Sequence, residues 1–279
     1  MVIEDIKARW VEKRPYIAFF FGFVYVFIGY GLAGIFFKNS ISVAMLFLST
    51  LLIVPTLIKL LKYEERAESR EGSRHFFRNH KEVFETYLFL FIGTFAGYIA
   101  LGQIFSLQFE GIFQFQLNFL KSQEGLSSEL INNFLNNGFT PSMQHVLGLL
   151  NNNLAIAVIC FLLSLFYGAG AIFLLMLNAS IFSAFIVFVM DQLSTRLSES
   201  FAVISFFLLH LVPETAGFLM AAIAGGVMSK ALITEKFGSR GFRNVAKDSA
   251  LLLLIACVFI ILAAFIEVYV TAGLFNRFF

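Results

Sequence analysis

The sequence predicts an all-α polytopic membrane protein, a bundle of about seven transmembrane helices with short amphipathic helices on its external side. Three observations lead to this fold class. Of the 279 residues, 59% are hydrophobic and only 14% are charged, whereas a soluble domain carries about 25% charged residues. The mean hydropathy is +0.83, and the apolar runs reach the roughly 20 residues that a helix needs to cross a bilayer. The basic residues, finally, cluster between these runs.

Seven apolar runs follow one another along the chain. The first is too long for the core of a signal peptide and is expected to remain as a membrane span. The fourth and fifth share one continuous run, which we divide at "YGAGA" (167–171), where two glycines permit a tight turn. The predicted spans are 15–37, 40–61, 83–105, 154–170, 171–190, 201–229 and 249–275.

The distribution of Lys and Arg supports this division and predicts an orientation. Sixteen of the 20 basic residues lie in the N-terminal segment, in the loop after the second span and in the loop after the sixth. If seven spans alternate, all three segments fall on one face, which the positive-inside rule assigns to the cytoplasm. We therefore expect a multi-pass protein of the cell membrane with a cytoplasmic N-terminus and an external C-terminus. The basic loops are expected to bind anionic lipid headgroups.

The chain divides into two parts on this interpretation. Residues 1–81 form an N-terminal transmembrane hairpin with a charged cytoplasmic segment, and residues 82–279 form a membrane core with an external helical loop, 106–153. Apolar residues recur at helical spacing in this loop, so we expect two or three short amphipathic helices on the outer membrane surface or over the bundle. Their sequences are "LQFEGIFQFQLNFLK", "SSELINNFLNNGF" and "TPSMQHVLGLL".

Small residues recur every four positions in two spans. Gly93 and Gly97 form a GxxxG pair in the third span, and Gly217, Ala221 and Gly225 form a stripe in the sixth. Small residues allow helix backbones to approach closely within a membrane. We expect these residues at helix contacts, either within the chain or between copies in a homo-oligomer. The expected partners of the protein are therefore the lipid bilayer and other protein chains.

The sixth apolar run contains ionisable residues in its middle. In "HLVPE", His210 and Glu214 lie four residues apart with Pro213 between them. On a continuous helix the two share a face, and that face continues into the stripe at Gly217, so both are expected to point into the bundle. Pro213 is expected to kink or break the helix, and a break would place Glu214 at the N-terminus of a half-helix. Intramembrane ionisable groups are usually functional; the alternative is a structural lock.

Other polar residues are candidates for the same interior: Asn178, Glu267, Glu85 and Gln103. For Asn178 the alternative is a hydrogen bond between helices, worth about 0.6–2 kcal/mol. A zinc site takes about three protein ligands, but only His210 of the four histidines lies in a span, and no HExxH motif occurs. We therefore expect no metal and no cofactor.

Catalytic patterns are missing from the sequence. It contains no GxSxG nucleophile motif and no glycine-rich phosphate loop, and its three aspartates, Asp5, Asp191 and Asp248, lie at span edges rather than at mid-membrane. No catalytic residue is assigned, enzyme activity is the least favoured class of function, and nucleic acid is not expected as a partner.

Three polar patterns occur in order along the core. Asn152 and Asn153 precede the fourth span, Asn178 lies in the fifth, and "HLVPE" lies in the sixth. Their order and spacing resemble the stage II sporulation protein M family, which shows an Asn-Asn pair, an Asn-Gly pattern with a second glycine, and a proline-containing break with His and Glu. Ala179 and Ser183 stand where that family has glycines, and the proline here follows the histidine instead of preceding it.

The resemblance covers residues 82–279, and the hairpin at 15–61 would be an addition. We predict one intramembrane polar site formed by His210, Pro213, Glu214, Asn178 and Asn153. The sporulation member of the family is similar to a membrane scaffold with peptidoglycan-remodelling partners.

Three functions follow from these observations. The leading one is a non-enzymatic scaffold that organises envelope or membrane-remodelling partners. The alternative is a transporter or channel for a small solute, ion or lipid through a polar cavity at His210 and Glu214, as in proteins with discontinuous helices. The third is an intramembrane hydrolase that uses the same pair as acid and base. A scaffold should tolerate an apolar pair at these positions, whereas the other two should lose activity on Glu214→Gln.

Overall fold

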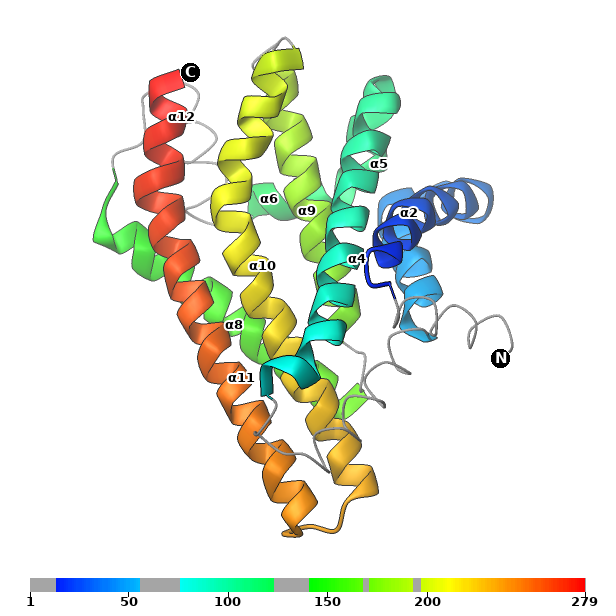
Figure 1. Ribbon diagram of the computed structural model, residues 1–279. Coiled ribbons are helices and arrows are strands. Elements are labelled where there is room, and N and C mark those ends of the chain that lie inside the picture. The colour runs from blue at the N-terminus through cyan, green and yellow to red at the C-terminus, as the bar shows by residue number, and fades with distance from the viewer. Residues whose placement is uncertain (1–13, 56–75, 123–140, 168–170, 193–196, 279) are drawn as a thin grey trace.

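Six described helices are long and apolar enough, by length and composition, to cross a membrane (Figure 1). Residues 14–55, 76–122, 141–167, 171–192 and 197–278 are described by this computed structural model, and every element in them is helical. The six are α2 (Ile17–Phe36), α4 (Phe76–Ile104), α8 (Met143–Tyr167), α9 (Ala171–Gln192), α10 (Leu197–Thr234) and α11 (Arg240–Phe265). With the shorter apolar helix Ile41–Pro55, they confirm the predicted bundle of about seven spans.

The division of the long fourth and fifth run is confirmed, since α8 ends at Tyr167 and α9 begins at Ala171. One expectation about the external loop was wrong. The segment that starts near Met143 is not a separate amphipathic helix, because it forms the first turns of α8. Apolar side chains at Val146 and Leu149 are buried in those turns, and this packing extends the span beyond the boundary that hydropathy alone suggested.

Helix α10 lies at the centre of the bundle and is the most buried of the candidate spans. It packs most extensively against α11 and then against α8. A Cβ atom at Gly217 would lie 3.1 Å from the Ala256 carbonyl oxygen of α11, and one at Gly225 would meet the Phe161 carbonyl of α8. Ala221 between them is fully buried. The small-residue stripe therefore serves contacts within this chain.

Pro213 does not break α10. The helix runs continuously from Leu197 to Thr234 with the proline inside it, so Glu214 does not lie at the start of a half-helix as one expectation had it. Helices α8 and α11 pack along α10 and bury its apolar residues, among them Phe218 and Leu219, and this packing holds the helix together despite the lost hydrogen bond.

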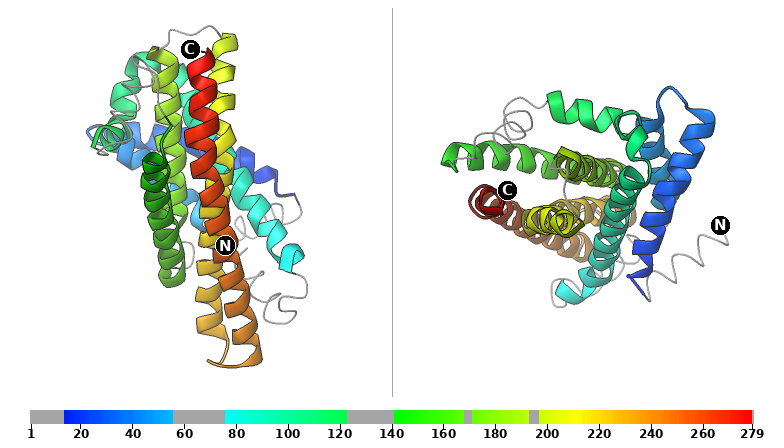
Figure 2. Two further views of the ribbon diagram at one scale, coloured as in Figure 1. Left: turned by 90° about the vertical axis from the view of Figure 1, so that its left-hand side faces the viewer. Right: turned by 90° about the horizontal axis from the view of Figure 1, so that it is seen from above.

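The N-terminal hairpin packs on the core through α4. A Cβ at Gly93 would meet the backbone of Phe19 in α2, and one at Gly97 would lie 3.2 Å from the Val26 side chain. Seen from above, α10 is viewed nearly end-on while α2 runs across the view (Figure 2). Helix α2 therefore crosses the bundle at a steep angle, and the predicted GxxxG pair is the place where it crosses.

The external loop folds back into the bundle. It continues from α4 through η2 (Ser106–Gln108), α5 (Phe109–Ile112) and α6 (Gln114–Ser122). Phe113 is fully buried with its ring 6.1 Å from that of Tyr98, and Gln116 donates to the Ser180 hydroxyl of α9 at 3.3 Å. These helices thus cover the bundle; the second helix expected in this loop lies outside the described residues.

Helix α11 continues without a break into a π-helix, η3 (Ile266–Thr271), and then into α12 (Ala272–Phe278). The C-terminus therefore lies at one end of the bundle, and the turn between α10 and α11 lies at the other (Figure 1). Exposed basic residues gather on this turn and the start of α11: Lys236, Arg240, Arg243 and Lys247. The other two basic segments lie mostly outside the described part of the chain.

Candidate functional site

His210 and Glu214 project from the same face of α10, as predicted. Four residues on a continuous helix advance by about 400°, so the two side chains lie one turn apart and about 40° around the axis. Both are buried, with 6% of His210 and 4% of Glu214 exposed. The His210 ring packs edge-on against Phe207, with 5.9 Å between the ring centroids. The pair therefore points into the helix bundle and not toward lipid.

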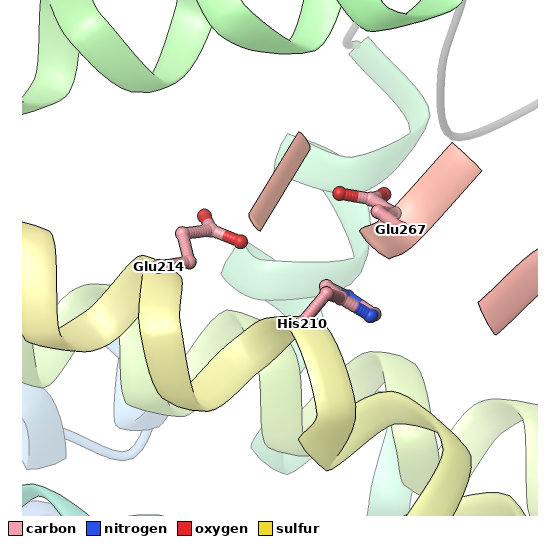
Figure 3. A group of neighbouring side chains, drawn as sticks. All are labelled: His210, Glu214 and Glu267. Carbon is pink, nitrogen blue, oxygen red and sulfur yellow. The ribbon is translucent and has the colours of Figure 1, made fainter. Parts of the chain in front are cut away.

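Glu267 joins this pair from η3. One ligand-type atom of each residue lies within 4.8 Å of the corresponding atoms of the other two. Figure 3 shows the carboxylates of Glu214 and Glu267 turned toward each other, with the His210 ring beside them. Residues more than 50 positions apart in the sequence thus form one cluster of an imidazole and two carboxylates.

Thr271 fixes the orientation of the His210 ring. The Thr271 hydroxyl donates to the Phe206 carbonyl of α10 at 3.4 Å, and the same oxygen lies 3.0 Å from Nδ1 of His210. A hydroxyl has a single hydrogen to donate. When Thr271 gives that hydrogen to the Phe206 carbonyl, Nδ1 of His210 is the donor to Thr271, and the lone pair of the neutral ring is on Nε2, where it is available to a proton or a cation.

In the part of the chain that the structure describes, the hydrogen bonds at the cluster are made by His210 and Thr271, and neither of them reaches the carboxylate of Glu214 or Glu267. Two ionised carboxylates within 4.8 Å repel each other by about 3 kcal/mol or more at an effective dielectric constant of about 20. Moving each into the membrane adds about 2.5–3.5 kcal/mol on insertion scales. The cluster is stable only with positive charge in it, as protons or as a bound cation.

The cluster lies well inside the membrane-spanning part of the chain. Glu214 follows the start of the candidate span Ile204–Thr234 by ten residues, and Glu267 precedes the end of Arg240–Leu274 by seven. At about 1.5 Å per residue these positions are about 10–15 Å from the corresponding ends of the two candidate spans. With those ends at the membrane surface, the site is at one third to one half of the depth of a membrane core about 30 Å thick.

The π-helix η3 positions Glu267 and Thr271, the two residues of the site that come from the last transmembrane segment. Its widened turn is closed by a bond from the Ala272 N–H to the Glu267 carbonyl, five residues earlier. In this turn Glu267 faces the carboxylate of α10 while Thr271 bonds to the Phe206 carbonyl and to His210. Single π-helical turns within α-helices are frequent at functional sites.

The other polar candidates are not connected to this cluster by hydrogen bonds among the described residues. Asn153 is buried in α8 and accepts from the side chain of Asn152 at 3.4 Å, and the Asn178 amide nitrogen in α9 is buried without a described partner. Glu85 forms an ion pair with Lys81 at 3.7 Å, and Gln103 is exposed. Asn153 and Asn178 remain predicted members of an intramembrane polar site.

The sequence did not predict that Glu267 and Thr271 lie beside His210 and Glu214. Glu267 was named only as one more interior candidate, and Thr271 was not named. A signal for them exists, because Glu267 and Thr271 have the same four-residue spacing as His210 and Glu214. The prediction of no metal site was based on the number of histidines within the spans. In the structure the carboxylates of Glu214 and Glu267 lie beside His210, so three possible metal ligands are close together.

The fold and this cluster define a class, the polytopic helical membrane proteins with an ionisable site in the interior. Within that class the chain belongs to the stage II sporulation protein M family, whose model matches residues 86–272. The match confirms the resemblance seen in the sequence, and it begins after the N-terminal hairpin. No curated protein and no solved structure is significantly similar to the chain.

Proposed function

We propose that the protein moves a small cation across the membrane by way of the cluster at His210, Glu214 and Glu267. The single observation that carries this proposal is the convergence of two carboxylates and an imidazole at membrane depth. Two carboxylates that face each other repel when ionised, which opposes a purely structural role for the contact. Ionisable residues within membranes mark ion pathways and proton relays, so the transport alternative is favoured over the scaffold.

Reconstituted liposomes test this function. We expect the wild-type protein to increase the flux of H⁺ or Zn²⁺, followed with an internal pH dye and an internal fluorescent chelator. Glu214→Gln should reduce that flux at least tenfold, because it removes one of the two charges that attract the cation. Glu110→Gln, at an exposed position in α5, is the matched control and should transport like the wild type. Equal flux in wild-type, Glu214→Gln and protein-free liposomes would exclude the proposed function.

A second function is favoured by the turn between α10 and α11. We propose that this turn lies at the cytoplasmic face of the cell membrane, that the C-terminus is external, and that the turn organises anionic lipids or partners there. The basic residues of the turn are accompanied by exposed apolar ones, Ile233 and Phe237. An apolar residue can enter the headgroup region while each nearby Lys or Arg contributes about 1 kcal/mol of attraction to an anionic surface.

Lipid nanodiscs of two compositions test this organiser role. We expect the protein to melt several degrees higher with phosphatidylglycerol than with phosphatidylcholine at low salt. The triple variant Lys236→Gln, Arg240→Gln, Arg243→Gln should lose this difference, and Lys38→Gln, whose exposed side chain belongs to the opposite predicted face, should keep it. An unchanged difference in the triple variant would contradict headgroup binding at the turn.

A further inference from the structure

We propose that His210, Glu214 and Glu267 bind a divalent transition-metal cation of the Zn²⁺ class. This inference rests on the proposed function, because it names the kind of cation that the same site takes. His210 and Glu214 come from one face of α10, Glu267 comes from η3, and their ligand atoms lie within 4.8 Å of one another. Figure 3 shows the two carboxylates facing each other beside the imidazole.

The spacing of the three groups fits a small metal ion. Zn²⁺ at about 2.0–2.2 Å from nitrogen and oxygen ligands keeps tetrahedral ligand atoms about 3.4 Å apart. Atoms that lie within 4.8 Å of one another therefore approach by about 1.4 Å at most when a metal enters. Rotations about side-chain torsions supply a movement of this size, so α10 and η3 need not move. Three protein ligands leave the fourth position open, as in sites that exchange a ligand.

The chemistry of the donor atoms selects the class of metal. Mg²⁺ and Ca²⁺ take oxygen ligands almost exclusively, and Ca²⁺ takes six to eight of them. An imidazole nitrogen suits Zn²⁺ and its neighbours in the first transition row, whereas thiolates and thioethers select Cu⁺. The cluster offers one nitrogen and two carboxylates and no sulfur. It therefore matches a borderline divalent cation better than a hard or a soft one.

Charge gives a second reason for a divalent ion. Two ionised carboxylates and a neutral imidazole carry two negative charges, and a divalent cation brings the site to neutrality. A monovalent cation would leave one uncompensated charge within the membrane, where such charge is costly. The divalent ion also replaces the repulsion between Glu214 and Glu267 with attraction of both to one centre.

Thr271 prepares His210 for metal binding. Metal-binding histidines usually donate their second ring N–H to an oxygen, which fixes the tautomer and the direction of the ligand nitrogen. Here Nδ1 of His210 lies 3.0 Å from the Thr271 hydroxyl oxygen, and in the tautomer in which Nδ1–H donates to this oxygen, Nε2 presents its lone pair. Thr271 is thus a positioning residue, and it is held in turn by the Phe206 carbonyl at 3.4 Å.

Burial provides an independent indication that the site takes a ligand. Glu214 is 96% removed from solvent, with 4% exposed, and its carboxylate points into the cluster (Figure 3). Among the described residues, the hydrogen bonds of the cluster join His210 to Thr271 and Thr271 to the Phe206 carbonyl, and neither includes this carboxylate. A buried polar group without partners is rare in folded proteins, and a metal ion supplies a partner to Glu214.

Metal analysis of the purified full-length protein tests the inference. After treatment with EDTA and reloading with Zn²⁺, we expect one Zn²⁺ per chain by mass spectrometry of the metal. Substituting Co²⁺ should give the visible absorption bands of a tetrahedral site with nitrogen and oxygen ligands. Ca²⁺ and Mg²⁺ at millimolar concentration should not displace Zn²⁺. These three readouts do not depend on transport.

Variants assign the bound metal to this site. His210→Gln, Glu214→Gln and Glu267→Gln should each lower Zn²⁺ affinity at least tenfold. Thr271→Val should lower it about tenfold or more while keeping the stoichiometry, since loss of a partner behind a ligand costs about 10–100-fold. His145→Gln, which changes a histidine bonded to Ser142 and not to the cluster, should bind like the wild type. Folding of each variant is checked by gel filtration and helical circular dichroism.

The outcomes separate this inference from the proposed function. Failure to bind Zn²⁺, or equal binding by the wild type and all three ligand variants, would overturn the metal site, even if liposomes show a proton flux. Displacement of Zn²⁺ by Ca²⁺ would overturn the class of metal. Site-dependent Zn²⁺ binding with no flux of H⁺ or Zn²⁺ would establish the metal site and exclude transport.

Discussion

Glu214→Gln is expected to raise the melting temperature of the metal-free protein by about 5 °C. The amide keeps the shape of the side chain but removes a carboxyl group that, without metal, must either stay charged within 4.8 Å of the Glu267 carboxylate or take up a proton at pH 8. Replacing buried ion pairs with apolar residues is neutral or stabilises proteins by up to about 1–4 kcal/mol. We expect a gain within this range here, and each kcal/mol corresponds to about 2–4 °C in a chain of this size. The measurement is thermal unfolding in detergent with EDTA at pH 8, followed by circular dichroism.

Glu110→Gln is the control for this prediction, because its side chain is exposed in α5, and it should change the melting temperature by less than about 1 °C. A fall of several degrees in Glu214→Gln would mean that the glutamate holds the structure together. That result would favour the scaffold function over cation transport. A rise, together with lost cation flux, is the pattern of a site that is kept for function at a cost in stability.

Gly225→Val is expected to destabilise the protein by about 3 kcal/mol, the upper end of the usual cost of overpacking. Even one added carbon at Gly225 would meet the Phe161 carbonyl, and it would lie 2.9 Å from the Ser164 Cβ. A backbone carbonyl in α8 cannot rotate out of the way as a flexible side chain does. Relief of the contact therefore requires α8 and α10 to move apart.

Gly148 offers a matched control for this substitution. It also lies in a membrane helix, but a Cβ atom there would have nothing within 4 Å. Gly148→Ala should stabilise the protein by up to about 1 kcal/mol, because alanine is the better helix former. Thermal unfolding of both variants in the same detergent measures the difference. Equal stability of Gly225→Val and the wild type would show that α8 and α10 do not pack as closely as the structure has them.

Much of the fold follows from local patterns in the sequence. Hydropathy and the basic loops were enough for about seven spans and for the separation of α8 from α9. The glycine stripes predicted close helix contacts, and Gly93 and Gly225 indeed lie against backbones of other helices. These features are local because the membrane restricts each span to one kind of element.

The partners of those contacts could not be predicted, because they depend on packing between distant segments. Glu267 lies beside Glu214 because of the register in which α10 packs against α11 and η3. A single sequence contains no direct signal of that register. The π-helix at Ile266–Thr271 was likewise hidden, because its residues have the same apolar composition as an α-helix. Pro213 shows the opposite case, in which a strong local signal for a break was overridden by tertiary packing around α10.

Helix α10 is long enough to connect the ionisable cluster with the basic turn at the other end of the bundle. Its 38 residues span about 57 Å, nearly twice the thickness of a membrane core, and its lower end extends with α11 beyond the other helices (Figure 1). From Pro213 to Thr234 the helix measures about 32 Å, so a tilt of about 5° at the proline displaces its end by about 3 Å. A change of tilt at Pro213, between His210 and Glu214, would therefore be amplified at the basic turn at the other end of the helix. The uninterrupted helix thus joins the ionisable cluster mechanically to the basic turn, where lipids or partners would respond to such a tilt.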